Sequence, residues 1–148
     1  MRLLDCANFL INRRFQVKPI ALVTGRVCSE AAELLASMCD VMLLREARTG
    51  QDLSAVMRHA TALMAVTPDC IDAAMLARCG RLRVIACAFH VPEHIDIAAC
   101  TRNGIWVTTA MTRALGKAAE IEAARNVLDV LSGDTPRGAL NEVFETAA

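Results

Sequence analysis

Ala62-Leu63-Met64-Ala65-Val66-Thr67-Pro68-Asp69 and, further along, Arg83-Val84-Ile85-Ala86-Cys87-Ala88-Phe89-His90-Val91 decide the fold of this chain. Each stretch begins with a short apolar run, which is typical of a buried strand, and continues into a loop that precedes a helical pattern. A third run, Gly104-Ile105-Trp106-Val107-Thr108, completes two consecutive strand–loop–helix units. Ligands bind beside the carboxyl ends of neighbouring strands in an open parallel sheet, so we expect a site at these loops.

Apolar runs and helical patterns alternate through the rest of the chain as well. We expect strands at 20–24, 40–44, 62–66, 83–88 and 105–108, and helices at 29–38, 50–59, about 72–80, 97–102 and 112–131. Short apolar strands that alternate with helices indicate a parallel sheet covered on both faces. With right-handed crossovers, this pattern predicts an α/β fold, a flavodoxin-like three-layer sandwich with a five-stranded parallel sheet in the order 2-1-3-4-5.

Four polar residues are expected to cap helices, because their side chains can accept a hydrogen bond from a free N–H group of the first turn. They are Ser29, Asp69, Asp72 and Asp96. The last helix is expected to bury one apolar stripe and to end at Ser132-Gly133. The stripe consists of Ile121, Ala124, Leu128 and Leu131.

The length of 148 residues predicts one domain, large enough to bury about two-thirds of its unfolded surface. We divide the chain into a loosely attached leader at residues 1–19, a single substrate-binding-type domain at residues 20–141 and a tail at residues 142–148. The leader has no clean periodicity, and the alternation of strands and helices begins after Pro19.

Charge and composition exclude two classes of partner. Sixteen basic and sixteen acidic residues cancel, and only 3% of the residues are aromatic, so we expect neither nucleic-acid nor membrane-surface binding. No run approaches the roughly 20 apolar residues that a membrane span needs. Asp5 and Asn8 interrupt the apolar start of the chain, which is therefore a poor signal peptide. We expect a cytoplasmic protein.

The sequence does not support a redox or metal site at the cysteines or histidines, or a dinucleotide-binding loop. The seven cysteines contain no Cys-x-x-Cys pair and mostly lie in apolar segments, so we expect reduced thiols that pack as small apolar groups. His90 and His94 are separated by Pro92, which prevents the helix that would align them on a metal. The seven glycines nowhere form Gly-x-Gly-x-x-Gly, so the chain has no evident loop for the pyrophosphate of a dinucleotide.

Two loops remain as a candidate site, Thr67-Pro68-Asp69 after one strand and Phe89-His90-Val91 after the next. If the two strands are neighbours, free backbone N–H groups of both loops face one crevice and can bind carboxylate or phosphate oxygens. His90 is the nearest titratable side chain. The alternative from these residues alone is that His90 is an exposed loop residue without a ligand.

Several segments resemble the substrate-binding (also called catalytic) domain of the D-isomer-specific 2-hydroxyacid dehydrogenases. They are 64–69, 82–88, 95–101 and 104–108, with a weaker match at 23–44, and residues 123–136 and 139–141 resemble the last part of the family's domain. The run from Ala99 to Thr108, Ala-Cys-Thr-x-x-Gly-Ile-Trp-Val-Thr, is the most specific. Within the family, the pattern is most similar to that of the phosphite (phosphonate) dehydrogenases.

The resemblance implies where a substrate would bind and what this chain lacks. In the family, an NAD-binding Rossmann domain is inserted between the Trp-Val-Thr strand and the last helix, whereas here residues 108–113 join the two halves directly. The catalytic arginine, glutamate and histidine of the family lie in or beside that insertion, so no catalytic residue is assigned. Phe89, His90 and Val91 correspond to the loop whose amides hold the substrate oxyanion, and Thr67 corresponds to a pocket-lining residue.

The candidate loop also departs from the family pattern. His90 stands where phosphite dehydrogenases carry lysine, Val91 where glycine is usual, and His94 where asparagine is usual. An unperturbed histidine is mostly neutral near pH 7, so its attraction for a dianion is weaker than that of lysine. A β-branched valine resists positive φ, so we expect a reshaped turn.

Three readings stay open at this point. The first is an oxidoreductase-family domain that binds a small anion but no cofactor, NAD being the cofactor of the family, and that is inactive alone. The second is a stand-alone anion-binding or regulatory module that forms a homodimer or docks a separate cofactor-domain partner. The third is a truncated product without activity.

Overall fold

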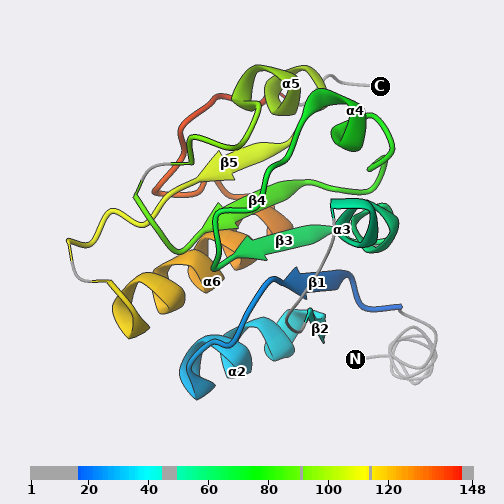
Figure 1. The fold of residues 1–148 in the computed structure, drawn as a ribbon. Helices are drawn as coiled ribbons and strands as arrows, with labels where there is room; N and C mark the ends of the chain where they lie inside the picture. The colour runs from blue at the N-terminus through cyan, green and yellow to red at the C-terminus, as the bar shows by residue number, and fades with distance from the viewer. Residues whose placement is uncertain (1–16, 45–49, 91, 114, 145–148) are drawn as a thin grey trace, which may run out of the picture.

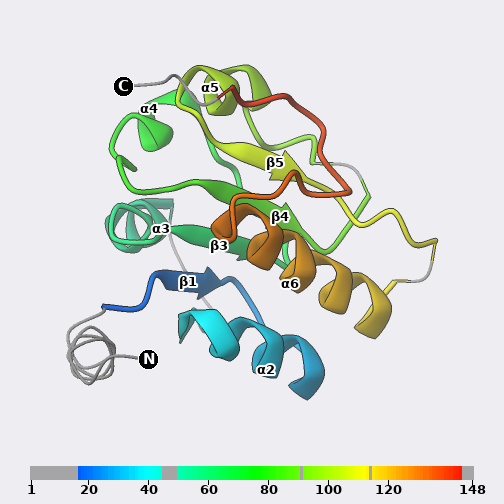
Figure 2. The same ribbon diagram turned by 180° about the vertical axis from the view of Figure 1, so that it is seen from behind.

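The computed structural model describes residues 17–44, 50–90, 92–113 and 115–144. The predicted leader lies almost entirely outside these residues, as does the end of the predicted tail. The described residues form one sandwich of a central sheet between two layers of helices (Figures 1 and 2).

The predicted five-stranded parallel sheet is confirmed (Figure 1). Its strands are β1 (Ile20–Val23), β2 (Asp40–Leu43), β3 (Ala62–Ala65), β4 (Val84–Cys87) and β5 (Trp106–Thr108). Their order is β2-β1-β3-β4-β5, and every neighbouring pair is parallel. The chain therefore starts near the middle of the sheet, adds β2 on one side and then builds the rest on the other.

Helices cover both faces of the sheet. On one face lie α2 (Ser29–Met38) and α6 (Lys117–Leu131), which Figure 2 shows in front. On the other lie α3 (Gly50–Met57), α4 (Ala73–Leu76) and α5 (Ile97–Arg102). Successive strand residues alternate between the two apolar cores, as a pleated strand requires: Leu63 packs with the α3–α5 layer, whereas Ala62 and Met64 pack with α2 and α6.

Two of the four predicted helix caps are confirmed. The carboxylate of Asp72 accepts a hydrogen bond from the N–H of Met75 at 2.8 Å, and that of Asp96 accepts one from the N–H of Ala99 at 2.9 Å. The other two predictions are wrong. Ser29 is the first residue of α2 rather than its cap, and Asp69 instead accepts a hydrogen bond from the hydroxyl of Thr67, at 2.7 Å.

The last helix differs from its prediction at the start and in its buried face. It begins at Lys117 rather than near residue 112, because Gly116, with φ of 79°, precedes it. Its predicted end at Ser132-Gly133 is confirmed, with Gly133 at φ of 86°. Of the predicted stripe only Ala124 is fully buried, because α6 packs against both the sheet and α2. The residues it buries are Ala119, Ala123, Ala124, Asn126, Val127 and Val130.

Residues 109–116, here called the connector, join β5 to α6. The carboxylate of Glu122 holds the connector against α6 by accepting hydrogen bonds from the N–H groups of Met111 (2.7 Å) and Thr112 (3.0 Å). The connector includes the join at which the resemblance described above would place an inserted domain.

Residues 136–141, here called the closing segment, run along the free edge of β5. The N–H of Thr109 donates to the carbonyl of Gly138 at 3.0 Å, and the side-chain oxygen of Asn141 accepts from the N–H of Val107 at 2.8 Å. Residues 108 and 139 form an antiparallel bridge. The closing segment therefore satisfies polar groups that an exposed edge strand would leave unpaired.

Candidate functional site

The two predicted site loops lie at the same edge of the sheet, the carboxyl edge, because β3 and β4 are neighbouring parallel strands. Ala65 at the end of β3 pairs with Cys87 at the end of β4. Thr67 and Phe89 therefore each lie two residues beyond the same pair of the sheet. The structure brings the two loops together, as the sequence analysis expected.

The first loop is organised by Thr24, a residue that the sequence analysis did not single out. Thr24 follows β1, is 2% exposed, and its hydroxyl oxygen accepts hydrogen bonds from the N–H groups of Val66 (2.9 Å) and Thr67 (3.4 Å). The N–H of Asp69 donates to the carbonyl of Thr67 at 2.8 Å. These three N–H groups are engaged within the protein, so this loop does not present the free amides that were expected of it.

The second loop keeps its donors available. Within the described part of the chain, the backbone N–H groups of Phe89 and His90 make no hydrogen bond. Phe89 is half-buried against the core of the α3–α5 layer, which fixes the start of the loop, and His90 is exposed. Val91, the fourth predicted site residue, lies outside the described residues.

The ring of His90 has a defined orientation. Its Nδ1 lies 3.0 Å from the carbonyl oxygen of Ala110 in the connector. A carbonyl oxygen only accepts hydrogen bonds, so Nδ1 carries the proton and donates it to Ala110. Nε2 is the ring nitrogen that is left for a ligand.

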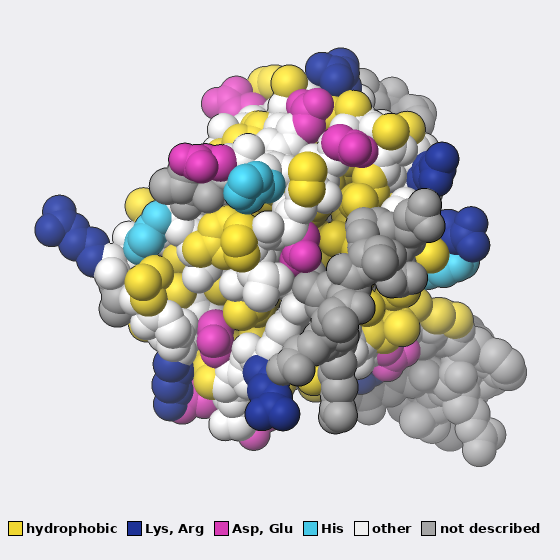
Figure 3. All heavy atoms as spheres, in the orientation of Figure 1, with side chains coloured by type: hydrophobic (Ala, Val, Ile, Leu, Met, Phe, Trp, Pro, Cys, Tyr) yellow, Lys and Arg dark blue, Asp and Glu magenta, His cyan; other side chains and the backbone are white. Residues whose placement is uncertain are grey.

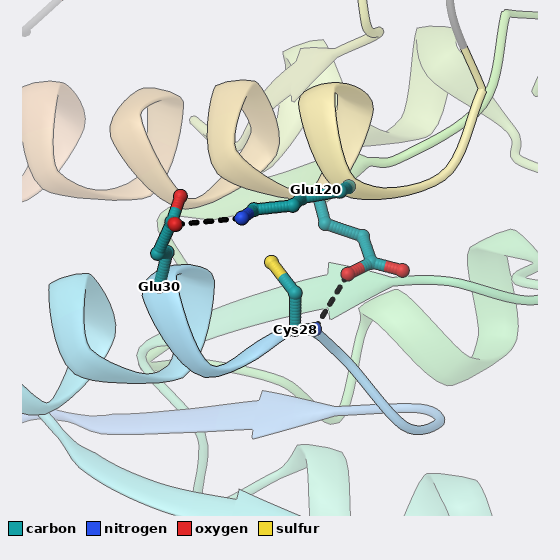
Figure 4. A network of polar contacts seen from close by, with 4 residues as sticks. Cys28, Glu30 and Glu120 are labelled. Atoms are coloured by element: carbon teal, nitrogen blue, oxygen red, sulfur yellow. Dashed lines mark hydrogen bonds and ion pairs between the residues drawn. The ribbon is translucent and has the colours of Figure 1, made fainter.

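A polar network links the amino ends of α2 and α6 beside this edge (Figure 4). The carboxylate of Glu120 accepts a hydrogen bond from the N–H of Cys28, the residue before α2, at 2.6 Å. The ammonium of Lys117 lies 2.6 Å from the carboxylate of Glu30, and this hydrogen bond and charge raise the pKa of Lys117. The amino end of α2 therefore already faces a carboxylate of the protein itself, which is the charge that a helix amino end favours.

The buried cysteines are protonated thiols near neutral pH. Burial raises the pKa of Cys39 to about 11, and those of Cys87 and Cys100 to about 12. A thiol rather than a thiolate is a poor nucleophile and a poor metal ligand. Among the residues that the structure describes, no three His, Cys, Asp or Glu side chains are grouped so that they could hold a metal ion.

The surface carries no strong field on the face drawn in Figure 3, where acidic and basic side chains are interspersed. In the described ranges, no helix is long and apolar enough to cross a membrane. The arrangement at the carboxyl edge is a local site: two amides without a partner among the described residues, and one imidazole held in place by Ala110, suited to one small oxyanion.

Comparison with known proteins finds a matching family model and a related enzyme. The family model described as "D-isomer specific 2-hydroxyacid dehydrogenase, catalytic domain" matches residues 21–141. A glyoxylate reductase from Aeropyrum pernix is 32% identical over 120 residues, which cover 76% of this chain and 36% of the relative. The chain thus spans about a third of the length of that curated relative.

Solved structures show the same fold. The PH0520 protein from Pyrococcus horikoshii is 27% identical with a TM-score of 0.58, over 62% of this chain and 27% of that one. The TT0316 protein from Thermus thermophilus is 29% identical with a TM-score of 0.57, over 62% and 30%. An NAD⁺-bound 3-phosphoglycerate dehydrogenase from Entamoeba histolytica has a TM-score of 0.55 over 64% and 33%, but its 18% identity shows the fold alone.

Proposed function

This chain belongs to the D-isomer specific 2-hydroxyacid dehydrogenase family through the catalytic domain of its members, and from that premise we propose that it binds a small carboxylate or phosphorus oxyanion. The site is the loop after β4, and its residues are Phe89, His90 and Val91, with Thr67 of the neighbouring loop beside them. The observation that carries the proposal is the pair of N–H groups at Phe89 and His90, neither of which has a partner among the residues that the structure describes.

His90 adds a side-chain contact to the same site. Its Nδ1–H is held by the carbonyl of Ala110, which orients the ring and leaves Nε2 for contact with a bound oxyanion.

The dinucleotide that the family uses is proposed to be held elsewhere than on this chain. The sequence has no Gly-x-Gly-x-x-Gly, and the amino end of α2, the kind of position at which a pyrophosphate sits, already faces the carboxylate of Glu120. A second anion there would be repelled. Hydride transfer requires the nicotinamide within about 3–3.5 Å of the reacting carbon or phosphorus atom, so we propose that this chain alone does not turn over.

Ligand binding is tested by thermal shift and calorimetry with oxalate, glyoxylate, phosphite and phosphate. At least one of these anions is expected to raise Tm, and H90A to weaken its binding about tenfold, because a hydrogen bond to a charged group is lost. The matched control is H94A, a second exposed histidine on the same segment. No binding by any of the four anions, or equal binding by H90A and H94A, contradicts the proposed site.

The proposal that the chain is inactive alone has a separate assay. The purified protein is mixed with glyoxylate or pyruvate and NADH, and in another reaction with phosphite and NAD⁺, and absorbance at the nicotinamide band is followed. No turnover above the buffer control is expected. A rate that scales with protein concentration would overturn this part of the proposal and leave the anion site intact.

A second candidate is a binding module that works with a partner, either a second copy or a separate cofactor domain. The supporting observation is that the connector exposes two large apolar side chains, Met111 (67%) and Leu115 (70%). Apolar groups gathered at one place on a surface mark contact sites. Sedimentation analysis distinguishes this candidate: association that M111S/L115S abolishes supports it, and a monomer at all concentrations that binds no nicotinamide-binding domain excludes it.

A further inference from the structure

A pocket of about 460 Å³ lies on the outer side of α6, apart from the candidate anion site. Its wall on α6 includes Ala118, Ile121 and Leu128, and Arg137 reaches it from the start of the closing segment. None of Thr67, Phe89 and His90 lines it. The volume is in the range of small-molecule sites in proteins.

Asn126 closes the inner side of the pocket. It lines the pocket and is 2% exposed, and its amide nitrogen has no hydrogen-bond partner among the described residues. That nitrogen is buried and lies against the backbone of the closing segment, since a Cβ at Gly138 would lie 3.1 Å from it. The groups that a ligand can reach are therefore the charged and apolar side chains of the pocket.

The charged groups of the pocket define the ligand. Arg125 and Arg137 are exposed, and neither forms an ion pair with another described residue. Asp129 lies one helical turn after Arg125 on the same face of α6. The carboxylate of Glu122 is already engaged by the connector. The pocket therefore offers two guanidinium groups and one carboxylate to a ligand.

We propose that this pocket binds an α-amino acid with an aliphatic side chain. The carboxylate is held by Arg137 and Arg125, the ammonium by Asp129, and the side chain by the apolar wall of Ile121 and Leu128. A simple anion is attracted by the two arginines but repelled by Asp129. A simple cation is attracted by Asp129 but repelled by the two arginines. A zwitterion of neutral net charge meets both.

The ligand test uses three molecules that differ by one group. They are L-leucine, 4-methylpentanoate, which lacks the ammonium, and 3-methylbutylamine, which lacks the carboxylate, each titrated into the full chain by calorimetry. L-leucine is expected to bind at least about tenfold more tightly than either, because each analogue leaves one charged group of the pocket unpaired. Absence of L-leucine binding, or equal binding of 4-methylpentanoate, overturns the proposal.

Variants then assign the charges. R137A is expected to weaken L-leucine binding at least about tenfold. D129N is expected to weaken L-leucine binding while 4-methylpentanoate still binds, at least as tightly as to wild type; a loss of folding would instead abolish binding of both. Arg125 also borders a second pocket between α2 and α6, so Arg137 is the sharper test.

The controls are R102A, on the distant α5, and H90A, at the carboxyl edge, and both are expected to leave L-leucine binding unchanged. If H90A removes L-leucine binding while R137A does not, the amino acid occupies the candidate anion site and the pocket on α6 is not its site. The wild-type protein alone shows whether L-leucine binds more tightly than its two analogues, so the proposal can be tested even if R137A or D129N does not fold.

Discussion

Glu120 and Cys28 are 92 positions apart in the sequence, yet the carboxylate of Glu120 accepts the N–H of Cys28 at 2.6 Å and so caps a helix to which it does not belong (Figure 4). The cap residue of α2 makes no side-chain hydrogen bond of its own. One carboxylate in the first turn of α6 therefore completes α2 and joins the two helices of that layer.

Glu120→Ala is expected to lower the free energy of unfolding by about 1–2 kcal/mol, the range seen when a helix loses its amino-terminal cap. Urea unfolding followed by circular dichroism measures the change. Glu142→Ala, which alters an exposed glutamate of the chain after the closing segment, is the matched control and should be neutral. Equal stability of the two variants would show that the contact adds nothing.

Thr24→Val is expected to destabilise the protein by about 1–3 kcal/mol, because valine keeps the shape but leaves the N–H groups of Val66 and Thr67 without their acceptor. Thr24→Ser keeps the hydroxyl and should recover most of the loss. Thr135→Val, at an exposed threonine, controls for the substitution itself. The expected order of stability from urea midpoints is wild type, then serine, then valine; a stable valine variant contradicts the assigned role of Thr24.

Gly138→Ala is expected to disrupt the closing segment, because a Cβ at this position would lie 2.2 Å from the carbonyl oxygen of Thr109. Relief of that overlap requires movement of backbone, so a loss of about 1–3 kcal/mol is expected. Gly80→Ala is a suitable comparison, since a Cβ there meets nothing within 4 Å. Thermal unfolding of both variants is the measurement, and a Gly138→Ala protein as stable as Gly80→Ala would exclude the close approach.

Stability is expected to fall at alkaline pH because of the buried thiols. The folded-state pKa values of Cys39, at about 11, and of Cys87 and Cys100, at about 12, lie above the ordinary value of 9.0. Their contribution is therefore complete below pH 9.0 and is lost as the pH rises toward the folded values, because only the unfolded chain ionises these thiols.

The expected loss is at most about 1.4 kcal/mol per pH unit for each such thiol. Urea unfolding at pH 8 and pH 10 measures it, and Cys87→Ala, itself destabilised by a lost side chain, should show a smaller difference between the two pH values. A difference as large as that of wild type would mean that Cys87 does not contribute.

The sheet was predictable because each apolar run in the sequence forms the buried strand that such a run favours. Runs such as 62–65 and 84–87 are apolar at every position, and a strand buried on both faces needs nothing else. The order of the strands followed from the handedness of the crossovers. The sequence pattern was therefore enough to place the carboxyl ends of β3 and β4 side by side.

The details of the site were not predictable, because they depend on contacts between distant segments. Thr24 organises a loop 42 residues further on, and Glu120 rather than Ser29 caps α2. No local pattern contains either fact. Asn126 is polar and yet buried, so an amphipathic stripe read from α6 alone could not include it. What local pattern did indicate was His90, whose partner in the connector only the fold reveals.

The connector has a broader consequence. It leaves the sheet at Thr109, which the closing segment holds, and it ends at α6, which begins at Lys117; between these fixed ends Glu122 of α6 holds Met111 and Thr112. Lengthening a loop whose ends are already fixed costs only about 0.6 kcal/mol for each doubling. A whole domain can thus be inserted into the connector, or removed from it, while the sandwich keeps its fold.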